Sequence, residues 1–469
     1  MIRRAFTLIE MLVSLAITLI MMGAVTTLFG LITDNVSGAR AGIEMADRLR
    51  ACRNRLQADL QAVTVGTMQP PLRPENDEGY FEYIEGINYD KAFVTGGNLS
   101  PLGDCDDVLM FTVRSRGEPF VGKLNGTGTV ESQVAEVMYF AVPNGPILDA
   151  TTPGNPTQLY TLYRRVLLVL PGLRVTNPGL FSPLSPTTQA FYDLNDVSVH
   201  VESPTGGPLL VPNTLGDLTK PECRFAHYGS SDLFPFPLNR NSPNRTGPLT
   251  NRPIGNNAFL VPFINTAFAN RVGDDVLMTN VLAFDVQVYD PNAPVSITSN
   301  VAVTPTDAGA AGAQVASGAF VDLGSTYIGS TTPLFNATVR RTVTGTLSPS
   351  PLLPMNKWSQ LVSGVLLNPP PTNTNDGSSS FTYDTWSLHY ENDGVLQNSN
   401  PSYQDLASNG LDDAGPGGAA DGIVDNLPEC ETLAPFAAKI RGIRVIVRAY
   451  EPSSQQVREI TVVQDFLPE

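Results

Sequence analysis

An uncharged apolar run close to the N-terminus constrains this chain more than any other feature. It extends from Met11 to Ile32 and contains no Pro and only two Gly. As a helix rising about 1.5 Å per residue, it would span about 33 Å, which is enough to cross the hydrocarbon core of a membrane. Arg3 and Arg4 precede the run and Asp34 follows it. The positive-inside rule therefore predicts a cytoplasmic N-terminus and an exported remainder.

A cleaved secretory signal is the alternative interpretation of such a run. Two features argue against it: the run is longer than an ordinary signal core, and no A-x-A cleavage site follows. The sequence continues without Pro, with apolar residues at roughly helical spacing up to Val63. We therefore expect one long helix over residues 7–64, which Pro70, Pro71 and Pro74 separate from the rest of the chain.

Glu10 stands at the border of this apolar run. A carboxylate in a membrane segment costs a few kcal/mol unless it is paired, so such a residue is a candidate for function. The alternative is an interfacial Glu at the depth of the lipid headgroups. Position alone does not decide between the two.

The residues around Glu10 resemble a known processing signal. Arg3 to Glu10 reads Arg-Arg-Ala-Phe-Thr-Leu-Ile-Glu, and an apolar helix follows. This pattern resembles the class III signal of type IV pilins and type II secretion pseudopilins, in which a short basic leader ends in Gly before Phe-Thr-Leu-x-Glu. Here Ala5 stands in the place of that Gly, and Ala is also small.

The resemblance implies a processing pathway and a set of partners. A prepilin peptidase would cut between Ala5 and Phe6 and methylate the new amino group of Phe6. In a filament, Glu10 would pair with the Phe6 amine of a neighbouring subunit, so that two costly charges neutralise each other. The implied partners are the prepilin peptidase, other pilin or pseudopilin subunits and the membrane.

The remainder of the chain is predicted to be rich in β-structure. Six segments are β-branched or aromatic with partial alternation, namely 107–115, 134–142, 158–170, 276–289, 440–450 and 455–464. The last two flank Glu451-Pro452-Ser453-Ser454 and predict an antiparallel hairpin. The fold class is therefore α+β: a long N-terminal transmembrane helix, then a mainly antiparallel β head with long loop insertions.

The predicted organisation has three parts: a leader at 1–5, a transmembrane and assembly helix at 6–66, and an exported β-rich head at 75–469. Segments rich in Pro, Gly, Asn and Ser interrupt the head at 171–190, 236–257, 291–350 and 367–380, and fit loops or small subdomains. A second β module around 295–390, with Trp358 and Trp386 as core candidates, is a further expectation. The order of the strands resembles that of larger minor pseudopilins. In these a strand ends Tyr-Arg-Arg, as Tyr163-Arg164-Arg165 does here, and we expect Arg164 and Arg165 to lie on a solvated strand face.

One acidic loop is a candidate calcium site. Residues 408–431 place Asp412, Asp413, Asp421 and Asp425 among Gly and Ala, and Ca²⁺ takes six to eight oxygen ligands. The spacing does not match an EF-hand, but it resembles the Asp/Asn/Gly calcium loops of some pseudopilin heads. A solvated acidic loop without metal is the alternative, and no other cofactor is expected.

Composition and motifs weigh against other functions. The net charge is −16 and the pI about 4.6, which disfavours a nucleic-acid partner. The chain has only three His and none of the common hydrolase, metalloprotease, P-loop or dinucleotide motifs, so we do not expect an enzyme. The four Cys (Cys52, Cys105, Cys223 and Cys430) allow three disulfide connectivities, among which the sequence does not choose.

These observations predict a structural subunit, a minor pseudopilin or minor pilin, of a type II secretion pseudopilus or type IV pilus. It would be a single-pass protein of the inner (cytoplasmic) membrane, with its head in the periplasm or outside the cell. One alternative is a membrane-anchored binding module or enzyme that uses a pilin-like signal for display. Another is an unprocessed single-pass protein, expected if Ala5 blocks cleavage.

Overall fold

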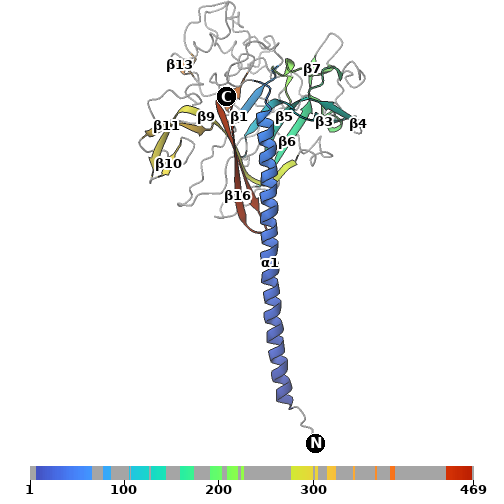
Figure 1. Cartoon of the computed structure of the whole chain (residues 1–469), viewed down its shortest axis with the longest axis vertical. Helices are drawn as coiled ribbons and strands as arrows, with labels where there is room; N and C mark the ends of the chain where they lie inside the picture. The colour runs from blue at the N-terminus through green and yellow to red at the C-terminus, as the bar shows by residue number, and fades with distance from the viewer. Residues whose placement is uncertain are drawn as a thin grey trace, which may run out of the picture.

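The computed structural model describes the N-terminal helix and the strands of the head (Figure 1). The described residues are 7–65, 78–85, 105, 107–125, 128–143, 159–173, 191–202, 209–219, 223–225, 276–298, 301–304, 314–323, 342–343, 365–366, 381–385 and 440–466. The Ala5–Phe6 bond, the four candidate calcium ligands, Cys430, Trp358 and Trp386 lie outside these ranges.

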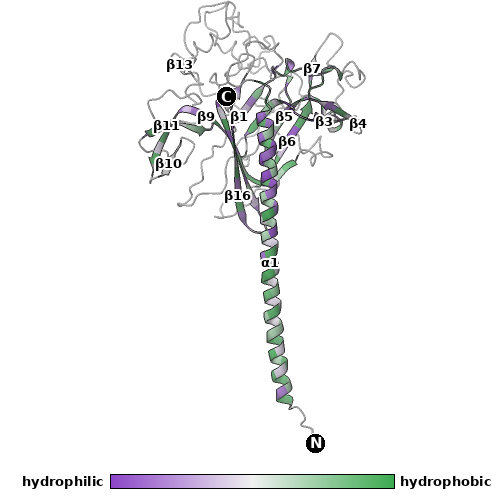
Figure 2. Cartoon of the chain, viewed as in Figure 1, coloured by the Kyte–Doolittle hydropathy of each residue, from purple (hydrophilic) through white to green (hydrophobic). Residues whose placement is uncertain are grey.

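Helix α1 (Leu8–Gln61) is 54 residues long and confirms the predicted helix. Its first half projects away from the head, and its second half packs against it (Figure 1). No Pro interrupts it, and Ala62 ends it with a backbone N–H that donates to the Asp59 carbonyl at 3.0 Å. The projecting half consists almost entirely of hydrophobic residues, whereas the half beside the head also contains polar residues (Figure 2).

The head is built on one large antiparallel sheet that is curled around the end of α1. Its strands lie in the order β14-β1-β2-β5-β6-β9-β15-β16, with β10 and β11 paired to the far end of β9. The bounds are β1 (Phe81–Glu85), β2 (Val108–Arg114), β5 (Val134–Pro143), β6 (Tyr160–Leu168), β9 (Val276–Thr298), β10 (Val301–Val303), β11 (Gln314–Val321), β14 (Phe381–Asp384), β15 (Gly442–Glu451) and β16 (Gln456–Asp465).

Three small two-stranded sheets accompany the large one. They pair β3 (Phe120–Leu124) with β4 (Gly128–Ser132), β7 (Val199–Glu202) with β8 (Leu209–Pro212), and β12 (Thr342–Val343) with β13 (Val365–Leu366). A short helix α3 (Phe191–Leu194) and a 3-10 turn η4 (Asp217–Thr219) flank β7 and β8. The segment that contains α3, β7, β8 and η4 is an insertion in the chain between β6 and β9.

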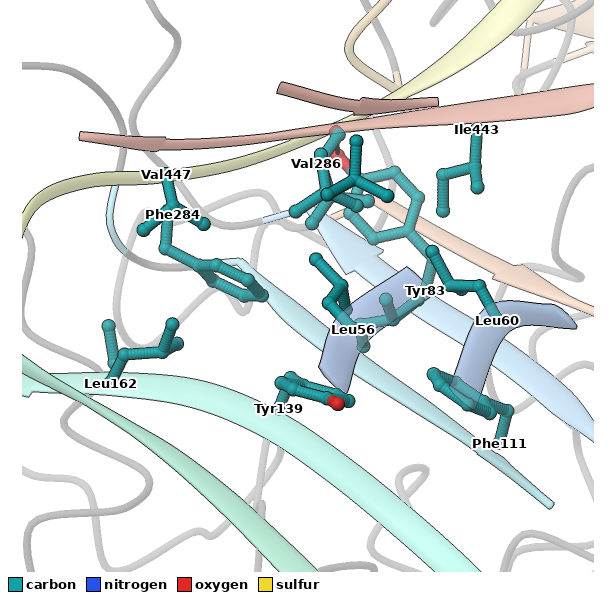
Figure 3. Packing of buried hydrophobic residues seen from close by; sticks show 14 of the residues in the cluster. Leu56, Leu60, Tyr83, Phe111, Tyr139, Leu162, Phe284, Val286, Ile443 and Val447 are labelled. Carbon is teal, nitrogen blue, oxygen red and sulfur yellow. Dashed lines mark hydrogen bonds between the residues drawn. The ribbon is translucent and has the colours of Figure 1, made fainter. Parts of the chain in front are cut away.

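The large sheet has a hydrophobic core on each face. On one face, α1 inserts Leu56 and Leu60 among Tyr83, Phe111 and Phe284 of the sheet (Figure 3). On the other face, a second core joins the sheet to the segment around α3, β7 and η4; its members include Tyr80, Met110, Phe140, Tyr192, Leu218 and Phe225. The sheet is thus covered by the helix on one side and by a chain insertion on the other.

The structure confirms the predicted fold class and corrects one part of the prediction. All six predicted strands are present, and β15 and β16 form the predicted hairpin with ten paired positions. Residues 291–298, however, do not begin a loop insertion, because β9 continues through Pro291 and Pro294 to Thr298. The pairing with β11 shifts register between Asp290 and Pro294, and a bulge is a place where a strand tolerates Pro. The proposed division of the head into modules stays a prediction.

Candidate functional site

The projecting half of α1 is the first candidate site. From Leu8 to Ile32 every side chain is exposed, and this stretch holds sixteen of the exposed large apolar residues in the described part of the chain, among them Leu15, Ile20 and Phe29. By length and composition the helix could cross a membrane. An apolar surface of this extent marks a membrane or protein contact rather than a solvated helix.

The polar side chains of this half are satisfied within the helix. The hydroxyls of Thr18, Thr26, Thr27 and Thr33 each donate to the carbonyl four residues before, at 2.7–2.8 Å. Ser14 donates likewise to the Met11 carbonyl at 2.9 Å. Because these hydroxyls need no water, the segment can lie in lipid or against other helices without leaving a donor unpaired.

Thr7 and Glu10 form a capping box at the start of the helix. The Thr7 backbone N–H and hydroxyl each donate to Glu10 Oε2 at 2.9 Å, and the Glu10 N–H donates to the Thr7 hydroxyl at 3.4 Å. The Glu10 carboxylate is exposed. Its second oxygen, Oε1, is not used by the cap, so Glu10 can start the helix and still accept a cationic donor from another molecule.

The other half of α1 is fixed to the head by a buried ion pair. Arg164 on β6 donates through Nε to Asp59 Oδ2 at 2.6 Å and through Nη2 to Asp59 Oδ1 at 2.9 Å. The Tyr139 hydroxyl donates to the same carboxylate. This two-pronged arrangement fixes both the distance and the rotation of the helix relative to the sheet.

The expectation that Arg164 and Arg165 lie on a solvated strand face is therefore wrong. Arg164 is 8% exposed and pairs with Asp59, while Arg165 is 2% exposed and lies 3.2 Å from Asp196 on the opposite face. Successive residues of a strand point to opposite faces, so one Arg reaches the helix and the other reaches the insertion. The partners lie far away in sequence, and the local pattern gives no sign of them.

A third buried arginine, Arg224, also ties the insertion to the sheet. Arg224 is fully buried, 2.9 Å from Glu82 on β1 and 2.5 Å from Asp384 on β14, with its guanidinium 4.1 Å from the centre of the Tyr80 ring. Nearby, Glu136 accepts from Tyr80 at 2.7 Å and from Ser198 at 2.6 Å. These polar contacts satisfy the residues that they join, so they serve to hold the layers of the head together.

Metal ligands and thiols give no further site within the described residues. No group of three or more His, Cys, Asp or Glu side chains there is arranged to hold a metal ion. Cys52 is a free thiol on α1, 1% exposed, in the core between helix and sheet, and Cys105 and Cys223 are also buried. Burial raises the pKa of the Cys52 thiol to about 12, so it is not a reactive nucleophile at neutral pH.

Comparison with known proteins identifies the N-terminal segment. A family model described as the prokaryotic N-terminal methylation motif matches residues 1–26, a range that contains Ala5, Phe6 and Glu10. No curated protein and no solved structure matches the chain. The motif therefore coincides with the exposed apolar half of α1, and the β head follows it. On this evidence the chain is similar to type IV pilins and pseudopilins in its N-terminal segment, where a helix long and apolar enough to cross a membrane carries the methylation motif.

Proposed function

We propose that this chain is a structural subunit of a type II secretion pseudopilus or a type IV pilus. The observation that carries the proposal is the division of α1 into two halves. One half is built into the core of the head, and the other projects as an uncovered apolar rod that bears the methylation motif. A helix of this kind is suited first to anchor the head in a membrane and then to pack among the helices of neighbouring subunits.

Processing would begin at the membrane. With residues 1–5 in the cytoplasm, the prepilin peptidase cuts between Ala5 and Phe6 and methylates the Phe6 amine. Cleavage removes Arg3 and Arg4 and leaves a cationic amine four residues before Glu10. The exported head is then held at the outer surface of the inner (cytoplasmic) membrane until the subunit is extracted.

Assembly would exchange lipid for protein around the same apolar surface. Because lipid tails and neighbouring helices are both apolar, the transfer costs little, and helix packing supplies the stabilisation. Oε1 of Glu10 is available to accept from the Phe6 amine of a neighbour, which neutralises both charges in an apolar bundle. The capping box holds this carboxylate at the end of the helix in advance.

The size of the head favours a minor subunit. At 469 residues the chain carries a sheet extended by β9, β10 and β11 and an insertion on its outer face. A head of this bulk would crowd a shaft built from many identical subunits. Its role is structural rather than enzymatic, and calcium bound by Asp412, Asp413, Asp421 and Asp425 would stabilise a loop without taking part in chemistry.

A membrane-anchored binding module or enzyme is the second candidate. Its signature would be clustered exposed aromatic residues or a concave pocket with convergent polar groups. Within the described part of the head, the large apolar side chains that are exposed are aliphatic, such as Val121, Ile297 and Val315. A binding module or enzyme displayed through the same signal would still be processed, but it would not need Glu10 for assembly. A requirement for Glu10 in assembly therefore separates the two candidates.

The test compares Glu10→Gln with Glu44→Gln, which changes an exposed carboxylate on the same helix. Both variants are expressed with the cognate prepilin peptidase and assembly machinery, and incorporation into sheared filaments is quantified. The proposal predicts that Glu10→Gln is processed yet lost from filaments about tenfold or more, whereas Glu44→Gln is incorporated normally. Equal incorporation of both variants would contradict the assembly role.

A further inference from the structure

Strand β16 forms a long and regular edge of the large sheet. It pairs with β15 at ten positions without a register shift, and no strand in the described part of the chain pairs with its other side. Its sequence contains neither Pro nor Gly. By contrast, β14 at the opposite end of the sheet has only four residues, and two register shifts interrupt the pairing of β11. Proteins usually shorten or distort such an edge, because its backbone groups can bind a further strand.

The hydrogen-bond pattern of the hairpin shows which backbone groups of β16 face outward. Directly after the last paired position, the Phe466 N–H donates to the Arg441 carbonyl at 2.9 Å. Bonded and non-bonded pairs alternate along an antiparallel ladder, so the even-numbered residues of β16 bond to β15 and the odd-numbered residues direct their N–H and C=O groups away from it. The outward residues in the middle of the strand are all exposed, namely Val457, Glu459, Thr461 and Val463.

The side chains of these four residues indicate what kind of strand would fit. The even-numbered Ile460 and Val462 pack in the core that α1 shares with the sheet, so the odd-numbered side chains lie on the opposite face. Three of the four are β-branched, and Val457 and Val463 are 40% and 52% exposed. Glu459 is the acidic member of the set. A complementary strand therefore has β-branched residues opposite the three and Lys or Arg opposite Glu459.

The open edge lies at the base of the head, next to the projecting half of α1. The β15–β16 hairpin extends down the side of the helix (Figure 1), and Gly42 faces Gln456 and Arg458. Ile32, which ends the apolar run, precedes Gly42 by ten residues, or about 15 Å of helix. A subunit that packs its own helix in parallel against the projecting half therefore brings its head beside β16.

We propose that the outer edge of β16 binds an extended strand from the head of a different pilin-like subunit, which continues the large sheet by one strand. The inference rests on the proposed function, because the partner must be anchored or assembled beside α1. Backbone hydrogen bonds supply the affinity, and the side chains opposite Glu459 and its β-branched neighbours supply the specificity.

A second copy of this chain fits the edge less well. Antiparallel pairing of two β16 strands would point the two α1 helices in opposite directions, because the hairpin runs alongside the helix (Figure 1). Both copies could not then be anchored in the same orientation. Parallel pairing in register would place Glu459 opposite Glu459, and like charges at this distance are destabilising. A different subunit avoids both conflicts.

The experiment measures amide hydrogen exchange of the full chain, residue by residue, in detergent and in sheared filaments assembled with the cognate machinery. In detergent, the amides of Glu459, Thr461 and Val463 should exchange fast, whereas those of Ile460 and Val462 should exchange slowly. In filaments, the outward amides should be protected about tenfold or more. Outward amides that exchange equally fast in filaments containing the chain would refute the inference.

A variant tests the same edge through assembly. Thr461→Pro removes one outward N–H and leaves the bonds to β15 in place, because an edge strand tolerates Pro where its N–H faces solvent. Thr461→Val is the control, since it keeps the backbone donor and the β-branched shape. We expect Thr461→Pro to lower incorporation into filaments about tenfold and the control to lower it less than about twofold.

Urea unfolding shows whether the Thr461→Pro head is folded, and the exchange measurement on the parent chain decides the question if it is not. Normal incorporation of a folded Thr461→Pro variant would contradict the inference. Protection of the outward amides in the concentrated, purified chain would assign the edge to a second copy and overturn it as well. A chain that enters filaments with an unprotected edge refutes this inference alone, whereas a chain that never enters them refutes the proposed function.

Discussion

Arg164 and Asp59 form a two-pronged, buried ion pair that joins strand β6 to helix α1 across 105 residues of sequence. The pair lies near the C-terminal end of α1, within the half of the helix that packs against the head. Because the guanidinium is planar and both oxygens of the carboxylate are engaged, the pair fixes how the helix is rotated. That rotation in turn decides in which direction the projecting apolar half presents each residue, Glu10 included.

Breaking this pair should destabilise the head strongly. Arg164→Met leaves Asp59 buried and without its cation, which typically costs about 3–5 kcal/mol in free energy of unfolding. The exposed Arg50–Asp47 pair is the control, since Arg50→Met should cost no more than about 1 kcal/mol. Urea unfolding of the full chain in detergent measures both values, and equal effects would show that the buried pair does not fix the helix.

The two halves of α1 should respond oppositely to removal of a leucine side chain. Leu56 is 1% exposed in the core, so Leu56→Ala should lower the free energy of unfolding by about 2–5 kcal/mol. Leu15 is 60% exposed, so Leu15→Ala should leave the stability of the head unchanged. Oligomer formation in detergent measures helix association. Here Leu15→Ala should weaken association, whereas Leu56→Ala should leave it unchanged. A loss of head stability in Leu15→Ala would contradict the division of the helix.

Glu85 should make the head less stable as pH rises. Its carboxyl group is buried, and desolvation together with the negative charges of Asp107 and Asp322 raises its pKa well above the ordinary value of 4.5. The folded state therefore holds a proton that the unfolded state releases above pH 4.5, and this contribution to stability is lost as pH climbs from 4.5 through the raised pKa.

The test for Glu85 compares unfolding free energies at pH 5 and pH 8 in the parent chain and in Glu85→Gln. The decline in stability with pH should be smaller in the variant, because the amide stays neutral throughout. Glu131→Gln, at an exposed position on β4, should retain the slope of the parent chain. An unchanged slope in Glu85→Gln would mean that this carboxyl group is ionised in the folded head.

Gly79 should not tolerate a side chain. Its φ is +71°, and a Cβ at this position would overlap the Thr112 hydroxyl. Gly79→Ala should cost at least about 1–2 kcal/mol from the backbone alone, with the displacement of Thr112 in addition. Gly117 has no heavy atom within 4 Å of the corresponding position, so Gly117→Ala is the matched control and should be nearly neutral by urea unfolding.

The elements found from the sequence are those with strong local signals. The helix followed from an apolar run and helical spacing without Pro, and the C-terminal hairpin followed from two β-branched segments around Glu451-Pro452-Ser453-Ser454. Strand β1 was missed because it has only five residues, and its pairing with β14, about 300 residues later, leaves no sign in the local sequence beside its pairing with β2. The continuation of β9 was missed because Pro291 and Pro294 predict a break unless a bulge accommodates them.

The residues of the candidate site also differ in whether the local sequence reveals them. Ala5, Phe6 and Glu10 could be named because a short linear motif carries the signal, and the Thr7–Glu10 capping box is local as well. The buried partners of Arg164, Arg165 and Arg224 could not be named. A strand residue reveals by its spacing which face it occupies, but not what covers that face.

The most direct test of the account is the intact mass and N-terminal fragmentation of the membrane-extracted chain, prepared with and without the cognate prepilin peptidase. The account predicts a chain that begins at N-methylated Phe6 when the peptidase is present, and one that retains Met1 to Ala5 when it is absent. A chain that keeps Met1 to Ala5 despite an active peptidase would contradict the pilin mechanism and leave α1 as a plain membrane anchor.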